Sequence, residues 1–473
     1  MRTTAVLPAI LIALLTLSTP TPAARAQAPS PKFEQIAALI AQKMAEYGVP
    51  GVAFGVLKDG QLLTRGFGVT NLDDVRPVTP DTIFPIASIS KTFTATAVMR
   101  LVEQGKLELD APVQRFLPGF RVQDEAHGRA VTVAHLLTHT PGWEGQTTAD
   151  DRGALTLQTF AESFGKYPKL ADPGEVWSYN NAGFTLAGRL IEVASGQSIQ
   201  NAFRSLVFEP LGLTRSFTRV EDVATWPLAV AHRGQPGQQT VVRPFSRSAS
   251  VAAGGVYSTV NDLLAFARFH MSDGTGQEGK PVLKKDTLAL MRAPRVKKAG
   301  TDDEMGLGWH LRKVGGVMTA AHGGTLSHIL LLELVPERNL AFTILTNHVD
   351  GWKLIQDVER ATLRILEGME LDPAMAIGHR GLNETMPAPP ILSRQPDPAP
   401  YLGEYRRPPT NSVNRVTVKD RQLMLDNNPI AFYGPDRAVV TSGNSRGNPI
   451  EFVRDKSGMV RWVRYVGRIA KKD

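Results

Sequence analysis

Ser88 and Lys91 stand three residues apart, where an apolar stretch that predicts a helix to Gly105 begins. Residues i and i+3 share a helix face, so the two side chains can touch. A serine hydroxyl is a weak nucleophile until a base takes its proton, and a buried lysine with a lowered pKa can be that base. At the start of the helix the Ser88 N–H is free to bind an oxyanion. The pair therefore predicts nucleophilic catalysis by Ser88.

Two further motifs carry residues that could assist such a reaction. Tyr179 can relay a proton, and Asn181 has an amide that can hold both Lys91 and a substrate carbonyl. His322 and Gly324 follow a predicted strand, and glycine at a strand end lets a substrate backbone approach the sheet edge. Each motif is weak alone, because tyrosine and histidine also serve as core residues.

Rival motifs fit their chemistry poorly. A second Ser-x-x-Lys, Ser163 to Lys166, is followed by signals that end a segment rather than open a helix. The sequence 443–447 matches the α/β-hydrolase elbow but has no histidine downstream of its serine. His135 and His139 have zinc-protease spacing, but the glutamate expected after the first histidine is missing, so we interpret them as packing residues beside a loop.

In order and spacing, Ser88-x-x-Lys91, Tyr179-x-Asn181 and His322-x-Gly324 resemble the three motifs of serine β-lactamases and penicillin-binding proteins. The stretches 136–142, 253–259 and 306–309 resemble the class C β-lactamase-related branch of this family. That branch also holds D-alanyl-D-alanine carboxypeptidases, D-aminopeptidases and β-lactamase-like esterases. The resemblance covers about residues 33–367.

The resemblance implies a role for each matching residue. Ser88 would be acylated, while Lys91 and Tyr179 would share the general-base and general-acid work, including activation of the hydrolytic water. Asn181 would position the substrate amide, and the N–H groups of Ser88 and Thr325 would form the oxyanion hole. Neither a metal nor another cofactor is expected.

The third motif departs from the family, because most β-lactamases have lysine where this chain has His322. A literal Lys-Ser-Gly at 456–458 is interpreted as a hairpin tip near the C-terminus. Some esterases and D-aminopeptidases of the family use histidine here. We therefore expect an exported serine hydrolase acting on esters, amides or D-amino acid peptides. The alternatives are a β-lactamase or D-alanyl-D-alanine carboxypeptidase, and a non-hydrolytic penicillin-binding sensor or scaffold.

Hydrophobic periodicity predicts an α+β fold in which helices flank an antiparallel sheet and a helical subdomain is inserted. Strands are expected at 52–57 and 62–69 near the N-terminus and as a meander over 309–346, with helices at 33–47 and 352–366. Short β-type runs after residue 400 predict a small all-β domain. This is the architecture of β-lactamases and D,D-peptidases, with an appended module.

The chain divides by composition into four parts. Residues 1–28 have a basic start, an apolar run and a small-x-small site, which predicts a signal peptide and a secreted or periplasmic protein. Residues 29–371 form the expected hydrolase domain, 372–400 a linker rich in proline, and 401–473 the β-rich domain. We expect no membrane span once the signal is removed, and the oligomeric state stays open.

Composition narrows the partners. The chain has 473 residues with 42% hydrophobic and 21% charged residues, which is typical of a globular protein. With 0 cysteines, disulfides, thiol catalysis and cysteine-ligated zinc are excluded. Of the net charge of +8, residues 401–473 carry +7, yet no purely basic strand face appears there. We therefore expect a small-molecule or peptide substrate and no nucleic acid.

Overall fold

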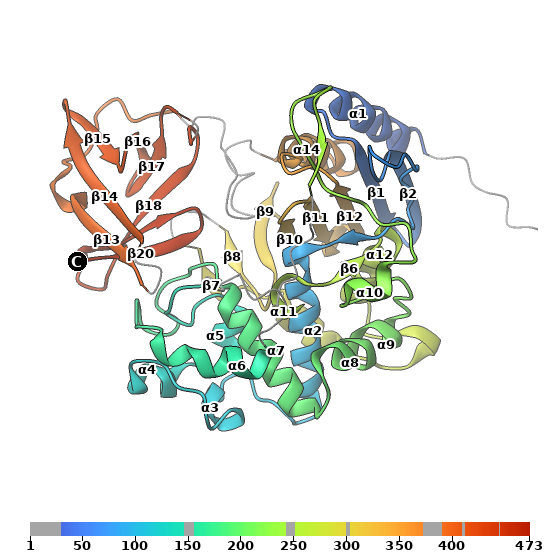
Figure 1. Ribbon diagram of the computed structural model, residues 1–473, viewed down its shortest axis with the longest axis horizontal. Coiled ribbons are helices and arrows are strands. Elements are labelled where there is room, and N and C mark those ends of the chain that lie inside the picture. Colours follow the sequence, from blue (N-terminus) through green and yellow to red (C-terminus); the bar gives the residue numbers. More distant parts are fainter. Residues whose placement is uncertain are drawn as a thin grey trace, which may run out of the picture.

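The computed structural model describes residues 30–145, 156–242, 251–298, 303–371, 390–408, 412–443 and 445–473. The predicted signal peptide, 1–28, and most of the predicted linker lie outside the described residues. Figure 1 shows an antiparallel sheet with helices and, beside it, a barrel formed by the C-terminal strands. The predicted α+β class with a small all-β domain is confirmed.

An eight-stranded sheet in the order β2-β1-β12-β11-β10-β9-β8-β7 forms the core of the larger body, and its neighbouring strands pair antiparallel. Its strands are β1 (Gly51–Lys58), β2 (Gln61–Gly68), β7 (Val296–Lys297), β8 (Glu304–Met305), β9 (His310–Val314), β10 (Val317–Thr325), β11 (Ile329–Val335) and β12 (Leu340–Thr346). The N-terminal hairpin therefore joins the predicted meander through β1 and β12, as expected.

Helices cover both faces of this sheet. On one face α1 (Pro31–Tyr47) and α14 (Trp352–Glu367) pack together and bury a cluster that includes Phe33, Phe54 and Leu331. On the other face lies α12 (Val260–Met271), and α2 (Ser90–Glu103) follows a 3₁₀ turn that contacts β10. The strands β1, β11 and β12 are buried almost throughout, because each is apolar on both faces.

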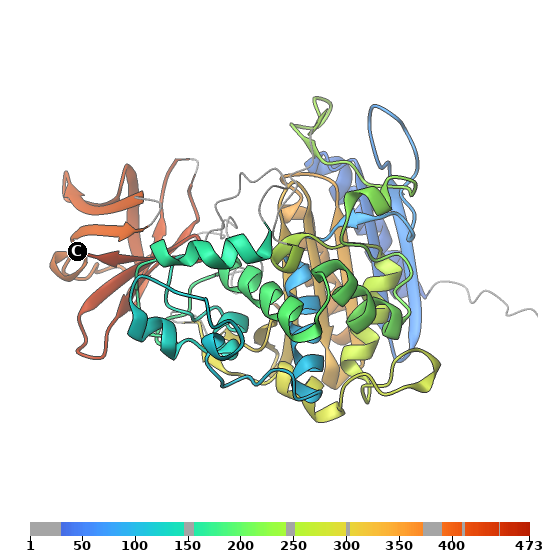
Figure 2. The same cartoon turned by 60° about the horizontal axis from the view of Figure 1, so that its bottom comes forward.

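The helical subdomain lies between β2 and the return of the chain to the sheet, and Figure 2 shows its helices in front of the strands. Its principal helix, α7 (Asn181–Ser195), packs on α2 and on α11 (Val251–Gly254). As a result α2 is buried along most of its length. The remaining helices are α3 (Val113–Phe116), α4 (Glu125–Ala130), α5 (Val133–Leu137), α6 (Leu157–Glu162), α8 (Ile199–Phe203), α9 (Glu209–Leu211), α10 (Val220–Val223) and α13 (Lys285–Met291).

The C-terminal strands close into a barrel with its own core around Tyr405, Phe432 and Phe452. They are β13 (Gly403–Arg407), β14 (Ser412–Lys419), β15 (Gln422–Leu425), β16 (Asn428–Gly434), β17 (Arg437–Val440), β18 (Pro449–Arg454), β19 (Val460–Tyr465) and β20 (Arg468–Lys472). The Lys-Ser-Gly sequence at 456–458 forms the turn between β18 and β19, as predicted. The Leu392 N–H donates to the Phe432 carbonyl at 2.9 Å, so the end of the predicted linker runs along the barrel.

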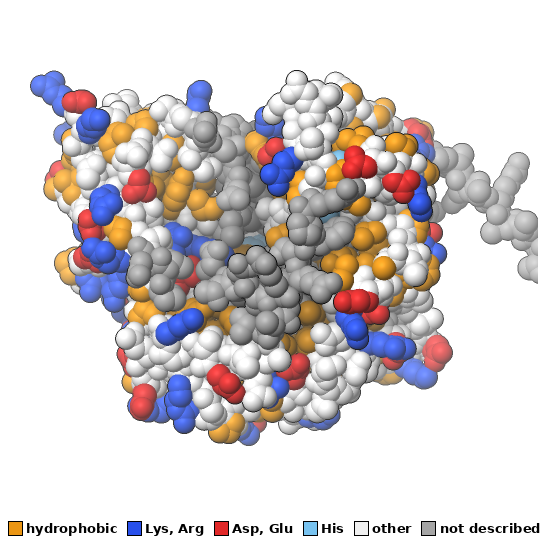
Figure 3. Space-filling view, viewed as in Figure 1, with side chains coloured by type: hydrophobic (Ala, Val, Ile, Leu, Met, Phe, Trp, Pro, Cys, Tyr) orange, Lys and Arg blue, Asp and Glu red, His pale blue; other side chains and the backbone are white. Residues whose placement is uncertain are grey.

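The barrel docks on the helical subdomain. A small apolar cluster joins Leu170 and Val176 of the subdomain to Trp462 and Ile469 of the barrel. The indole N–H of Trp462 donates to the Leu170 carbonyl at 2.9 Å. Basic and acidic side chains are interspersed over the face shown in Figure 3. Within the described ranges, none of the helices has both the length and the apolar content needed to cross a bilayer.

Candidate active site

Ser88 lies in a 3₁₀ turn, Ala87–Ile89, that leads directly into α2. Ala87 has a φ of 46°, a left-handed conformation that is unfavourable for a residue with a Cβ. The turn is held by Ser90, whose hydroxyl donates to the Ala87 carbonyl at 2.6 Å and accepts from the Val256 N–H at 3.0 Å. This backbone leaves Ser88 half-buried while its neighbours Ala87 and Ile89 are buried.

Lys91 lies one turn further along, and its side chain is completely buried. Its Nζ donates to Ser88 Oγ at 3.0 Å and to the Ala253 carbonyl at 2.6 Å. Burial lowers the pKa of Lys91 well below its usual value, and the positive charge of Arg468 lowers it further. Lys91 therefore has the contact that a base for Ser88 requires, and its surroundings favour the unprotonated amine.

Tyr179 lies against the same lysine, with Lys91 Nζ 4.9 Å from its ring centroid. Burial raises the pKa of Tyr179 to about 12, although its hydrogen bond with Ser88 and the charge of Arg468 act in the opposite direction. The phenol is therefore protonated at neutral pH. Lys91 favours its neutral form and Tyr179 keeps its proton, so the pair can supply a base and an acid around Ser88.

The segment that carries Tyr179 is extended and lies against His139. The Ser178 N–H donates to the His139 carbonyl at 2.9 Å, and the Asn180 N–H donates to His139 Nδ1 at 2.9 Å. The imidazole of His139 stacks on the Tyr179 ring, with centroids 4.5 Å apart. His139 itself has a φ of 60°. This histidine therefore fixes both the backbone and the ring of Tyr179.

Asn181 is the first residue of α7, and its N–H donates to the Gly145 carbonyl at 2.8 Å. The sequence suggested that its amide would hold Lys91. The structure instead gives Lys91 the Ala253 carbonyl, from the stretch 253–259 that resembles the family. The role of the Asn181 amide toward substrate stays a prediction.

His322, Gly324 and Thr325 close β10 beside the Ser88 turn. A Cβ on Gly324 would lie 2.5 Å from the Ile86 carbonyl oxygen and 3.4 Å from Ala87 Cβ. Only glycine permits this approach, which brings the edge of the sheet to the nucleophile. The predicted third motif therefore lies at the site, next to the first.

His322 is buried and neutral. Its Nδ1 donates to the Gly323 carbonyl at 2.7 Å, so the lone pair of the neutral ring is on Nε2. Burial lowers the pKa of His322 to about 3, and the nearby Lys91 adds to the effect. The histidine thus brings no positive charge to the position where most β-lactamases have lysine.

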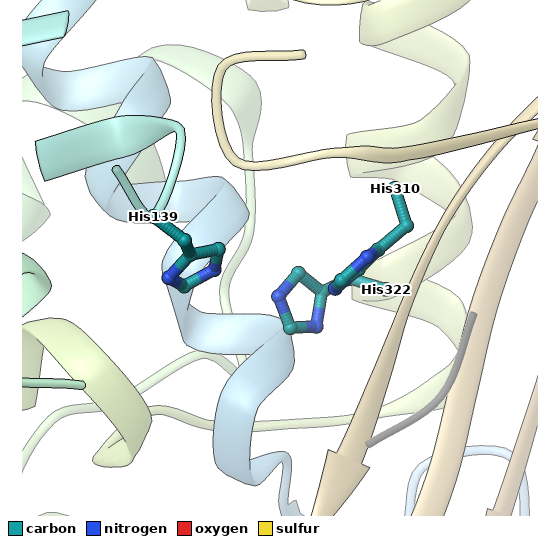
Figure 4. Close-up of side chains that lie close together, drawn as sticks. All are labelled: His139, His310 and His322. Carbon is teal, nitrogen blue, oxygen red and sulfur yellow. The ribbon is translucent and has the colours of Figure 1, made fainter. Parts of the chain in front are cut away.

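Three buried histidines, His139, His310 and His322, converge here, and one ring nitrogen of each lies within 4.8 Å of the others (Figure 4). A metal ligand must offer a nitrogen lone pair, and a neutral imidazole then carries its proton on the other nitrogen. His139 Nδ1 already accepts the Asn180 N–H, so its ring proton is on Nε2. Metal binding through Nε2 would break that bond. Each of the three rings also packs against the Tyr179 ring.

Four residues that contact or influence the site were not predicted from the sequence. His139 was interpreted only as a packing residue beside a loop, and Ala253, Arg468 and Lys298 were not singled out. Burial lowers the pKa of Lys298 to about 8, and its charge helps to keep His322 unprotonated. The stretches 136–142 and 253–259 were the available signal for the first two residues. Nothing local marks Arg468 or Lys298.

Comparison with known proteins identifies the family of this chain. The sequence model of the β-lactamase family matches residues 36–364, which is most of the chain. The chain belongs to the β-lactamase family. The resemblance drawn from the three motifs is thereby confirmed, and the match ends where α14 ends, before the barrel.

Relatives of this β-lactamase-family protein carry several names. Penicillin-binding protein 4 of Amycolatopsis lactamdurans is 35% identical over 76% of this chain and 94% of that protein. Esterase EstB of Burkholderia gladioli is 30% identical over 61% of this chain and 82% of its own. The crystal structure of SurE superposes with a TM-score of 0.77 at 28% identity and covers 93% of this chain and 99% of that one. It was also solved with D-Leu, at a TM-score of 0.75 and 27% identity over the same shares.

Gly145 offers a test of how Tyr179 is positioned. A Cβ at residue 145 would lie 2.3 Å from the Tyr179 carbonyl oxygen, so Gly145→Ala must displace the Tyr179 segment. We expect kcat on an ester to fall about 100-fold, the effect of a misplacement near 1 Å. The matched control is Gly165→Ala, where an added Cβ meets nothing within 4 Å. Equal activity of the two variants would contradict the assignment.

Proposed function

We propose that this protein is an exported serine hydrolase that acts through a Ser88 acyl-enzyme on esters or amides, including D-amino acid peptides. The contact that carries the proposal is the 3.0 Å hydrogen bond between Lys91 Nζ and Ser88 Oγ, made by a lysine that is fully buried. Membership in the β-lactamase family, whose relatives include an esterase, supports hydrolysis. The position of Tyr179 against Lys91 supports the proposed acid and base.

In the acylation step, neutral Lys91 takes the hydroxyl proton as Ser88 Oγ attacks the substrate carbonyl. The N–H groups of Ser88 and Thr325 bind the oxyanion, and Asn181 orients the substrate amide. Tyr179, protonated because burial raises its pKa to about 12, donates a proton to the leaving group. In deacylation the same residues act in reverse on water, which releases the acid and restores Ser88.

The third motif bears on the substrate. A lysine suits a carboxylate beside the scissile bond, whereas His322 is neutral, with a pKa lowered to about 3. Esters and amides without that carboxylate are therefore the favoured substrates. An esterase among the relatives supports this class. The similar structure that was solved with D-Leu supports a D-amino acid as part of the substrate, although D-Leu itself carries a carboxylate.

Two alternatives keep specific support. A penicillin-binding protein is among the relatives, and Arg468 could supply the positive charge that His322 lacks. Both favour a β-lactamase or D-alanyl-D-alanine carboxypeptidase as the second candidate. A non-hydrolytic sensor would keep the acylation step and lose turnover, so multiple turnover on an ester separates it from a hydrolase. Export rests on residues 1–28 alone.

Replacement of the nucleophile tests the proposal. Ser88→Ala should abolish labelling by a fluorophosphonate and ester turnover, because the variant lacks the hydroxyl that Lys91 contacts. Ser163→Ala, in the second Ser-x-x-Lys sequence, is the matched control: its hydroxyl donates to the Phe160 carbonyl at the end of a helix. Mass spectrometry of the labelled peptide decides the matter, and stoichiometric labelling of Ser88→Ala would refute the assignment.

The pH dependence of kcat/KM should have an acid limb set by Lys91. Protonation of Lys91 removes the base, so activity is lost as pH falls through the lysine pKa. Burial lowers that pKa, so we expect the limb below the range of an ordinary lysine. Lys91→Arg, which stays charged, should lose about 10²–10⁴-fold at every pH. A profile that rises only above pH 10 would contradict a neutral Lys91.

His322→Lys tests substrate selection. A charge-assisted contact of about 1.5–3 kcal/mol corresponds to roughly 10–150-fold in binding. For the variant, the ratio of kcat/KM on a carboxylated cephalosporin to kcat/KM on a neutral ester should therefore rise at pH 7–8, by up to that factor. Wild type and variant are compared on one cephalosporin and one p-nitrophenyl ester. Fast wild-type cephalosporin turnover that the lysine reduces further would refute the preference for neutral substrates.

A further inference from the structure

The turn between β19 and β20 reaches from the barrel to the Tyr179 segment. Tyr179 donates its N–H to the Gly467 carbonyl at 2.9 Å, and Ile469 donates its N–H to Ser178 Oγ at 3.2 Å. Arg464 donates to the Trp177 carbonyl at 2.9 Å. The three consecutive residues 177–179, which end at the proposed acid Tyr179, are thus hydrogen-bonded to the β19–β20 hairpin of the barrel.

The opposite edge of the same segment is bonded to His139 through the N–H groups of Ser178 and Asn180. The segment therefore lies like a strand between His139 and the barrel hairpin, with hydrogen bonds alternating to either side. Its position is determined jointly by the two domains.

The hairpin also places a buried cation at the site. Arg468 is 5% exposed and donates to Glu144 of the helical subdomain, which is 2% exposed, at 3.1 Å. This ion pair crosses the domain interface. Arg468 is the first residue of β20, directly after the turn. A buried guanidinium held by such a pair has a fixed position, and its field is little screened by solvent.

Strain in the hairpin agrees with a functional placement. The two turn residues, Val466 and Gly467, have φ values of 52° and 70°. Glycine and asparagine suit such a turn, but a β-branched valine at positive φ is unfavourable. Strained residues persist where the surrounding structure fixes them. Here Gly467, which follows the strained Val466, accepts the Tyr179 N–H.

We propose that the barrel is a working part of the active site: its β19–β20 turn positions Tyr179, and Arg468 is a positioning residue that acts through Lys91 and Tyr179. The inference rests on the proposed function. Among the titratable groups around Lys91 are Tyr179, His139, His322 and Arg468, and burial keeps the first three uncharged. His310 and Lys298 lie beside His322, and Glu144 is bonded to Arg468. Arg468 is the cation whose charge lowers the pKa of Lys91.

The charge of Arg468 favours both proposed roles. It lowers the pKa of Lys91 and so favours the free base, and it lowers the pKa of Tyr179 and so makes the phenol a better acid. Without the barrel charge, Lys91 would be protonated over a wider pH range and Tyr179 would hold its proton more tightly.

The test compares full-length Arg468→Met and Arg468→Lys with wild type in pH profiles of kcat/KM on p-nitrophenyl butyrate. Arg468→Met should move the acid limb to higher pH and lower kcat/KM at pH 7 about 10–100-fold. Arg468→Lys, which keeps the charge, should retain the wild-type limb. Arg415→Met, on an exposed side chain elsewhere on the barrel, is the control and should change neither.

Because Arg468→Met leaves Glu144 without this partner, Glu144→Gln/Arg468→Met is made in parallel, and circular dichroism confirms folding. A limb shift in the folded double variant, absent in Arg468→Lys, supports the proposal. An unmoved limb in the folded double variant overturns it, even where the maximum rate falls.

Ser178→Ala separately tests whether the β19–β20 turn positions Tyr179. It removes the acceptor of the Ile469 N–H and should lower kcat with little change in KM, while the acid limb stays in place. Unchanged kcat would overturn the positioning role of the turn. Fluorophosphonate labelling of wild-type Ser88 is measured first: without it the proposed function fails, whereas labelling with an unmoved limb refutes only the role of Arg468.

Discussion

A buried lysine without charge is the condition on which the site depends. Lys91 lies on α2, which is buried along most of its length and packs against α7 and α11. Removing an ammonium from water is costly unless a counter-charge accompanies it. The described partners of Lys91 are a hydroxyl and a carbonyl, both uncharged. The fold thus favours the neutral amine of Lys91. Burial in the core is what lowers the lysine pKa, and the lowered pKa is what suits Lys91 to act as a base.

Backbone strain gathers around this lysine. Ala87, His139 and Val466 all have positive φ values, and each precedes or contacts a residue of the site. Such conformations cost on the order of 1–3 kcal/mol each. Each is held by long-range contacts: Ser90 and Val256 hold the Ser88 turn, while His139 and the barrel turn hold the Tyr179 segment. The stability of the two domains therefore maintains the geometry of the proposed catalytic groups.

The sequence predicted those features that local patterns determine. Strands β1, β2 and β9 to β12 and helices α1 and α14 lie within a few residues of the expected ranges, because their apolar periodicity is strong. In the folded chain Lys91 and Tyr179 lie beside Ser88 and Gly324 lies beside Ala87, while the roles predicted for these residues stay predictions. Ala253, His139 and Arg468 could not be found in this way. Their contacts join residues 162, 41 and 324 positions apart, and only the folded chain brings them together.

The barrel supplies a positive charge that acts on the active-site lysine of the other domain. His322 is neutral at the position where a lysine would carry charge, and burial lowers the pKa of Lys298 to about 8. The charge that lowers the pKa of Lys91 is that of Arg468, which an ion pair with Glu144 holds at the interface. A small displacement of the barrel would therefore change the protonation of Lys91 and the position of Tyr179 together. In this arrangement the appended domain is coupled to the reaction by the same bonds that dock it.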